Sequence, residues 1–172
     1  ESGNVDIVAE DDAEALAKAR ELISVLPSNN ENTGVICECD DDLNRITAGL
    51  GTHVKDTAVA LREISDNNWF LELKADCAKE MVIGFIRLNG AIVGAVANRS
   101  EILGEDGKAA KKFDSVLTMA GAYKAAHFVN LCDSFSIPVL TLTSVTGFAS
   151  SVGEERSIAC LLYTSPSPRD RQ

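Results

Sequence analysis

The chain opens with an amphipathic helical pattern. Apolar residues recur at helical spacing over residues 11–26, and two aspartates open the stretch, where a helix dipole favours anions. Pro27 follows directly and cannot continue a helix. We therefore predict a helix over 11–26 that buries one face, carried by Ala15, Ala19, Leu22, Ile23 and Leu26.

The next fifty residues are less regular. A polar loop occupies 28–32, and no clear period follows up to about Leu50, so we interpret this stretch as a linker or arm. A second short helix is predicted over 55–65. The asparagine pair at 67–68 ends it, and the apolar run over 69–73 favours a short strand.

The strongest local signal in the chain is a β-hairpin. Residues 81–88 and 91–98 are two apolar runs rich in β-branched residues, and Asn89-Gly90 separates them. A type I′ turn needs positive φ at both central positions, which Asn-Gly supplies at low cost. We predict an antiparallel hairpin over Met81–Asn98 that turns at Asn89-Gly90.

The last part of the chain alternates between loops and regular elements. Residues 99–113 are polar and contain glycine, which predicts a loop, and 137–143 reads as a strand. A turn is expected over 145–149, and a further helix begins near 150–159. Between them, 115–135 is predicted to be a long helix with Leu117, Ala120, Ala125, Phe128, Val129 and Cys132 available for burial.

A hairpin followed by a long helix and another strand indicates an α/β fold built from ββα units. The helix allows the strand after it to join the sheet in parallel, and open α/β sheets bind ligands at the carboxyl ends of their strands. Gly147, Phe148 and Ala149 follow such a strand, and backbone N–H groups there could hold an anion or oxyanion. On pattern alone, an ordinary loop with a packing glycine remains the alternative.

Charge and cysteine content narrow the function classes. The chain has a net charge of −10, and residues 1–42, with twelve acidic and two basic residues, carry most of the excess. Without a basic stripe, a nucleic-acid binder is excluded. The five cysteines are scattered and lack the spacing of a zinc site, so we expect reduced thiols, no bound metal and a cytoplasmic protein. No apolar run is long enough to span a bilayer, and the acidic start lacks the features of a signal peptide.

The last thirteen residues, 160–172, differ in composition from the rest and contain two of the four prolines. Their first eleven residues can be encoded by a nucleotide string that resembles a sequencing-library adapter read in frame. The alternative is a flexible Ser/Pro-rich tail. We expect this segment to make no stable contacts and the natural sequence to be cut near Ala159, so that the chain is a fragment.

Several strings resemble one protein family when they are taken in order. The family is the carboxyltransferase subunits of biotin-dependent acyl-CoA carboxylases and related decarboxylases. Its versions of these strings are "VVGFARLNG", "VGIVAN" and "KAARFIRFCDAFNIP". The corresponding residues here are Val82–Gly90, Val93–Asn98, Lys124–Phe128, and Leu131–Phe135 with Ile137-Pro138. A fifth string, Leu26–Asn30, resembles the segment between the two domains of these subunits. The order and most of the spacing hold from about residue 2 to residue 159, and five strings in register are a specific signal.

The resemblance implies a crotonase-like α/β fold repeated in two domains, of which this chain holds a part. Residues 1–30 would end the N-terminal carboxyltransferase domain, and 31–80 would form a connecting arm. Residues 81–159 would be the first half of the C-terminal domain, and 160–172 the adapter-derived tail.

The resemblance also implies an activity. The family moves a carboxyl group between a biotin, carried on a partner protein, and an acyl-CoA such as propionyl-CoA or methylmalonyl-CoA. Backbone N–H groups stabilise the oxygens that gain charge, and no metal is needed. The implied partners are a biotin carboxyl carrier protein, a biotin carboxylase or membrane decarboxylase subunits, and further copies of the chain. Gly147 and Phe148 would be the catalytic backbone on the biotin side, with Ala149 joining them in binding biotin.

The resembling loop departs from the family pattern "DVPGF", because Ser144 and Thr146 replace its aspartate and proline. The loop between Asn98 and Lys124 is also longer than usual. These departures leave a second hypothesis, a crotonase-fold subunit that serves only assembly. The glycine-rich peptides that would complete both oxyanion sites lie outside this sequence, so the chain alone should be inactive.

Other reactive residues are weaker candidates. His53 lies in a Gly-Thr loop without a partner nearby in sequence, and His127 replaces a helix arginine of the family, which suggests a surface position. Ser150-Ser151 lacks the elbow motif of a serine hydrolase, and Cys132 reads as a buried helix residue. No lysine is flanked by methionines as in a biotin-attachment site.

Overall fold

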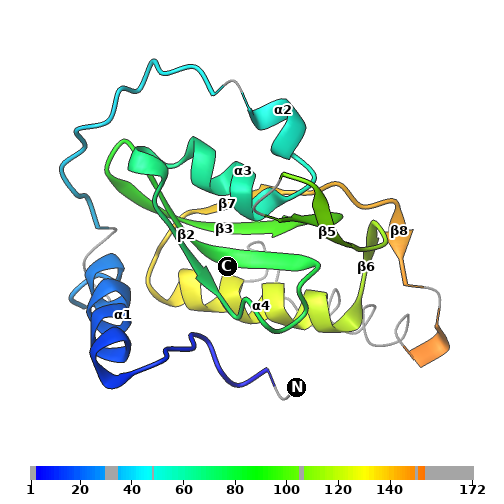
Figure 1. Ribbon diagram of the computed structural model, residues 1–172. Helices are drawn as coiled ribbons and strands as arrows, with labels where there is room; N and C mark the ends of the chain where they lie inside the picture. Colours follow the sequence, from blue (N-terminus) through cyan, green and yellow to red (C-terminus); the bar gives the residue numbers. More distant parts are fainter. Residues whose placement is uncertain (1–2, 30–34, 48, 105–106, 150, 154–172) are drawn as a thin grey trace, which may run out of the picture.

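The structure, a computed structural model, describes residues 3–29, 35–47, 49–104, 107–149 and 151–153. A four-stranded sheet in the order β1-β2-β3-β7 forms its centre (Figure 1). Its strands are β1 (Phe70–Leu73), β2 (Met81–Leu88), β3 (Ala91–Asn98) and β7 (Val139–Leu142). The first three are antiparallel neighbours, whereas β7 runs parallel to β3. The predicted α/β architecture is confirmed in this part of the chain.

Helices cover both faces of this sheet (Figure 1). The helix α4 (Met119–Ser134) lies on one face and α3 (Thr57–Ile64) on the other. Successive side chains of a strand point to opposite faces, and here both faces are apolar. The α4 face buries Ile83, Phe85, Ile92, Phe128 and Cys132 among others. The α3 face buries Ala58, Leu61, Val82, Ile86, Ala95 and Ala97.

The hairpin is confirmed with its turn at the expected residues. β2 and β3 pair from Leu88 and Ala91 at the turn to Met81 and Asn98 at the open end. Asn89 and Gly90 have φ values of 51° and 77°, as a type I′ turn requires. The Asp66 carboxylate accepts hydrogen bonds from the N–H groups of both turn residues, at 3.0 and 2.7 Å. A side chain from the preceding segment thus fixes the turn.

The first helix, α1 (Asp12–Val25), forms as predicted, but its buried face differs from the expected one. Asp11 caps it by accepting a 2.7 Å hydrogen bond from the Glu14 N–H. Ile23 was expected to be buried and is 71% exposed, whereas Val25 is completely buried. The helix packs on the core through its C-terminal turn, where Leu22 and Leu26 are partly buried beside Val25. Helical spacing alone could not indicate which turn would be in contact.

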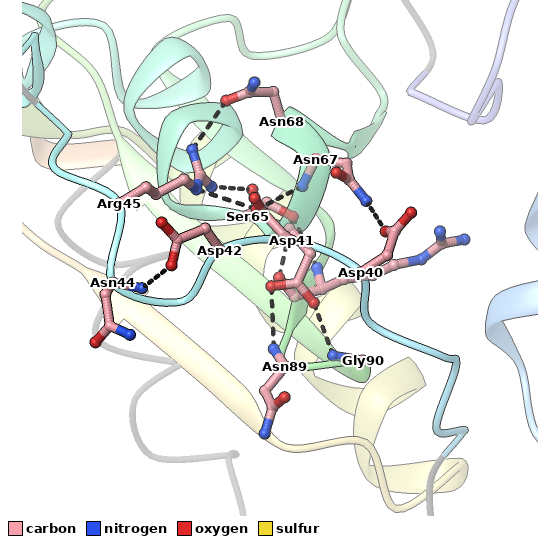
Figure 2. A network of polar contacts seen from close by, with 12 residues as sticks. Asp40, Asp41, Asp42, Asn44, Arg45, Ser65, Asn67, Asn68, Asn89 and Gly90 are labelled. Carbon is pink, nitrogen blue, oxygen red and sulfur yellow. Dashed lines mark hydrogen bonds and ion pairs between the residues drawn. The ribbon is translucent and has the colours of Figure 1, made fainter.

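Polar side chains of the predicted arm bind the segment just before β1 (Figure 2). Asp40 and Asp41 accept hydrogen bonds from Asn67 in the 3₁₀ turn η1 (Asp66–Asn68), at 2.7 and 2.8 Å. Arg45 bridges Asp41 and the Ser65 carbonyl oxygen, at 3.0 and 2.6 Å. Acidic residues of the stretch interpreted as a linker or arm therefore fix the segment before β1.

Before α3, the arm ends in a four-residue helix, α2 (Leu50–His53), that the sequence did not predict. The predicted helix over 55–65 and strand over 69–73 are confirmed as α3 and β1, and both belong to the central sheet and its cover. The domain boundaries proposed at residues 31 and 81 remain predictions.

The segment before α4 was predicted to be a loop but forms a small hairpin. β4 (Glu101–Leu103) pairs with β5 (Ala109–Lys112). The loop prediction was wrong because the glycine content of this segment favours a loop, and its two strands are too short to show a recognisable pattern. One of the two strands is also fully exposed. α4 begins four residues later than predicted, because Thr118 caps it at the Gly121 N–H and β6 (Val116–Leu117) precedes it.

Two predicted segments fall wholly or mostly outside the described residues, namely the tail 160–172 and the helix over 150–159. Within the described ranges, no helix combines the length and apolarity needed to cross a membrane.

A buried lysine on α4 was not predicted. Lys124 is 4% exposed, and its ammonium donates to a group of backbone carbonyl oxygens in the β1–β2 connection. The acceptors, at 2.6 to 3.5 Å, are those of Lys74, Cys77, Ala78 and Met81. Burial lowers the pKa of Lys124 from its ordinary value of 10.5 to about 8, opposed by the nearby Glu72 carboxylate.

This lowered pKa predicts a pH dependence of stability. The folded chain binds the Lys124 proton more weakly than the unfolded chain, so the unfolding free energy should rise as pH increases from about 8 towards 10.5. The gain should be roughly 2 kcal/mol between about pH 7.5 and pH 10. The measurement is urea unfolding of the wild type and of Lys124→Met across this pH range. The difference in unfolding free energy between the two proteins isolates the effect, since the other groups titrate in both proteins. A difference that does not change with pH would contradict the prediction.

Candidate functional site

The candidate loop lies at the carboxyl end of β7 (Figure 1). The turn predicted over 145–149 is replaced by a short strand, β8 (Gly147–Phe148), which pairs in parallel with β6. The turn prediction was wrong because this pairing joins residues about thirty positions apart and leaves no local signal. The loop is consequently part of a two-stranded sheet.

The start of the loop is fixed by Asn98, the last residue of β3. The Asn98 side-chain amide donates to the Ser144 carbonyl oxygen at 2.9 Å, and its oxygen accepts from the Ser144 N–H at 2.6 Å. Asn98 is 8% exposed. One buried side chain therefore binds both backbone groups of one loop residue.

The end of the loop is fixed by β6 and the residue before it. The Thr146 N–H and hydroxyl both donate to the Ser115 carbonyl oxygen, at 2.7 and 2.8 Å. The Ala149 N–H donates to the Leu117 carbonyl oxygen at 3.0 Å. Residues 144–149 are thus held on both sides, and Gly147 and Phe148 lie between the two attachments.

The three predicted site residues have different surroundings. The φ of Gly147 is outside the left-handed region, and a Cβ added there would meet no atom within 4 Å. A larger residue at 147 would therefore test access to the loop rather than strain in it. The Phe148 ring is 53% exposed. The Ala149 N–H already bonds to Leu117 and is not available to a ligand in this arrangement.

A cavity of about 510 Å³ opens beside the start of this loop. Apolar side chains of α2 and α3 line it, together with the polar residues Asn98, Thr143 and Ser144. None of the described residues that line it carries a charged side chain. Such a cavity suits an uncharged, mostly apolar group with a few hydrogen-bonding atoms. Its lining is Leu50, Val54, Thr57, Ala60, Ile64, Asn98, Thr141, Leu142, Thr143 and Ser144.

The other reactive side chains lie away from the loop. His53 has a partner ten residues further along the chain, because its Nδ1 contacts the Glu63 carboxylate. His127 is exposed on α4, as expected. Cys132 is completely buried, and burial raises the pKa of its thiol to about 11, so it remains protonated and unreactive. Among the described residues, no three histidine, cysteine or acidic side chains gather as a metal site would require.

The contacts that hold the loop were missed by sequence reasoning. Asn98 closes an apolar strand, and Ser115 precedes α4, but 46 and 31 residues separate them from their partners. A buried polar residue at the end of a strand is the one signal that could have singled out Asn98. Ser115 acts only through its backbone oxygen, so its side chain carries no signal at all.

Comparison with known proteins identifies the family. Residues 1–158 match the Carboxyl transferase domain. The chain is 37% identical over 161 residues to the propionyl-CoA carboxylase beta chain of Roseobacter denitrificans, covering 90% of this chain and 30% of that protein. It is 36% identical over 160 residues to the methylmalonyl-CoA carboxyltransferase 12S subunit of Propionibacterium freudenreichii subsp. shermanii, covering 90% and 29%.

A solved structure agrees with this result. The transcarboxylase 12S crystal structure with methylmalonyl-coenzyme A and methylmalonic acid bound superimposes with a TM-score of 0.74 at 35% identity. The match covers 94% of this chain and 32% of that one, so the chain spans about a third of the length of such relatives. The crotonase-like fold expected from the resemblance is therefore confirmed for the matched part. The chain belongs to the carboxyl transferase domain family.

Proposed function

We propose that the complete protein containing this chain moves a carboxyl group between biotin and an acyl-CoA of the propionyl-CoA or methylmalonyl-CoA type. The observation that carries this proposal is the loop over 144–149, held at both ends with Gly147 and Phe148 between. Relatives named for propionyl-CoA and methylmalonyl-CoA chemistry support the substrate class.

The orientation of the loop backbone supports a particular donor. Neighbouring N–H groups along an extended strand point in opposite directions. The Ala149 N–H points to β6, where it bonds to Leu117, so the Phe148 N–H is expected to point away from β6. An N–H that a sheet holds in place can stabilise a developing oxyanion without reorganising. Phe148 is therefore our choice for the donor, with Gly147 beside it.

The residues present fit a biotin ring. Biotin is a compact bicyclic urea, with an apolar body and one strongly accepting oxygen. Open space at the Gly147 Cβ position lets such a ring approach the backbone, and the exposed Phe148 ring offers an apolar surface. Carboxybiotin, when bound, would supply the carboxyl group, and the negative charge left on the biotin would fall largely on its ureido oxygen. The role of this chain is to orient the ring and to hold that oxygen through the Phe148 N–H.

The partners follow from the same proposal. A biotin carboxyl carrier protein would deliver biotin, and a biotin carboxylase or membrane decarboxylase subunits would complete the enzyme. Assembly with further copies of the chain in the cytoplasm is also proposed. The transcarboxylase 12S relative, whose crystal structure shows a hexamer assembly, supports an oligomer.

The test separates the N–H from the ring of Phe148. Phe148→Pro removes both, whereas Phe148→Ala removes only the ring, so the second variant is the matched control. In the complete protein, we expect Phe148→Pro to lower the rate of carboxyl transfer from carboxybiotin to propionyl-CoA by about 10²- to 10³-fold. Phe148→Ala should lose less, and chiefly through a raised KM for carboxybiotin.

Two outcomes would contradict the proposal. If Phe148→Pro folds normally and transfers as well as Phe148→Ala, the N–H is not a donor. If the unmutated complete protein transfers carboxylate to none of a panel of acyl-CoAs, the assembly subunit becomes the better reading. The departures at Ser144 and Thr146 are the observation that favours this second candidate.

A further inference from the structure

We propose that Asn98 is a positioning residue that holds the Gly147–Phe148 peptide in its working place by binding the backbone of Ser144. The inference rests on the proposed function, because only that function gives a reason why the position of this peptide matters. Its side chain binds the backbone of residue 144 rather than the donor group itself.

The contact requires a carboxamide. The backbone of Ser144 offers one donor and one acceptor, and the Asn98 side chain meets the donor with an oxygen at 2.6 Å and the acceptor with a nitrogen at 2.9 Å. Aspartate could accept but not donate, and serine or alanine cannot span both groups. Since Asn98 is buried, losing either bond leaves polar atoms without compensation.

Asn98 is itself held firmly, so it can transmit position. Its backbone is paired with Met81 at the open end of the β2–β3 hairpin. The next residue, Arg99, is buried, its N–H donates to the Glu80 carbonyl oxygen at 2.8 Å, and its guanidinium faces Asp56 at 3.6 Å. The position of the loop is therefore fixed relative to the two central strands, β2 and β3.

The two departures from the family pattern fit this arrangement. Asn98 binds the backbone of residue 144, so the contact does not depend on whether the side chain is serine or aspartate. At residue 146, a proline would fix φ but could not donate a hydrogen bond. Thr146 instead donates from both its N–H and its hydroxyl to Ser115. In this chain, hydrogen bonds replace a proline ring in ordering the loop.

The test uses Asn98→Asp and Asn98→Ala in the complete protein, with Asn130→Ala on the exposed face of α4 as the matched control. Amide hydrogen exchange of peptides covering residues 140–149 reports the loop directly. We expect exchange at Ser144 to be at least about ten-fold faster in Asn98→Ala, faster by a smaller factor in Asn98→Asp, and unchanged in the control. Asn98→Asp retains the acceptor and should be the milder variant.

Carboxyl transfer provides the second readout. A displaced donor should lower kcat by about 10- to 100-fold, with little change in the KM for acyl-CoA. Unchanged exchange at Ser144 in folded Asn98 variants would overturn the proposal. So would faster exchange with unchanged kcat. If the unmutated protein transfers nothing, the proposed function fails, and the exchange result still decides whether Asn98 holds the loop.

Discussion

Replacing Gly84 with alanine is expected to lower the unfolding free energy by at least about 3 kcal/mol. Gly84 lies in the middle of β2, which is paired on both sides, opposite Glu72 of β1. A Cβ at this position would come closer than 3.0 Å to the Leu71 carbonyl oxygen and to the Phe70 ring. The backbone oxygen cannot move without separating β1 from β2. Urea unfolding followed by circular dichroism measures the loss.

The matched control is Gly94→Ala on the neighbouring strand. A Cβ there would lie 2.6 Å from the Cys132 Sγ and 3.2 Å from the Phe128 ring, which are ends of side chains on α4. Because side chains can shift, we expect a loss of about 1–2 kcal/mol. Adding Cys132→Ala should recover part of it, giving a favourable coupling energy. Equal losses for the two glycine variants would contradict the assigned cause.

The hairpin, α4 and β7 could be predicted because their signals are local. Asn89-Gly90 defines a turn type, and apolar runs on both sides define strands buried on two faces. The ββα order then predicted that β7 joins the sheet in parallel, and the structure pairs it with β3. The family resemblance covered the same strings, so local pattern and resemblance agreed.

The arm and Lys124 could not be predicted, because their contacts join residues far apart in the chain. Asp40 and Asp41 bind the turn at Asn67, some 26 residues away, and nothing near them in sequence indicates a partner. Lys124 looks like a surface residue of a helix, since lysine is rarely buried. Its carbonyl acceptors, 43 to 50 residues earlier, exist only once β1 and β2 have paired.

For the candidate site, the sequence predicted which loop forms it but not the hydrogen bonds that hold the loop in position. The loop after β7 follows from the topology, and Gly147 and Phe148 follow from the family pattern. Ala149 was expected to join them, but its N–H is used in pairing with β6. Whether a backbone N–H is free depends on the neighbouring strand, and β6 has only two residues and no recognisable pattern.

The arm leads to the other large expected effect, at Gly90. Its φ of 77° is unfavourable for any residue with a Cβ, and that atom would come closer than 3.0 Å to the Cys37 carbonyl oxygen. The arm runs alongside here, where the Cys37 N–H donates to the Gly90 oxygen at 2.8 Å. Gly90→Ala should therefore combine backbone strain with loss of arm docking, and cost about 3 kcal/mol.

Gly107→Ala separates these two causes. Gly107 has nearly the same φ, 71°, but a Cβ there would meet no atom within 4 Å, so only strain of about 1–2 kcal/mol is expected. The thiol of Cys37, which is partly buried, provides an independent reading of the arm. Its reaction with a thiol reagent should become faster in Gly90→Ala and stay unchanged in Gly107→Ala. Similar losses of stability in the two variants, with Cys37 equally protected, would mean that the arm contributes nothing at this turn.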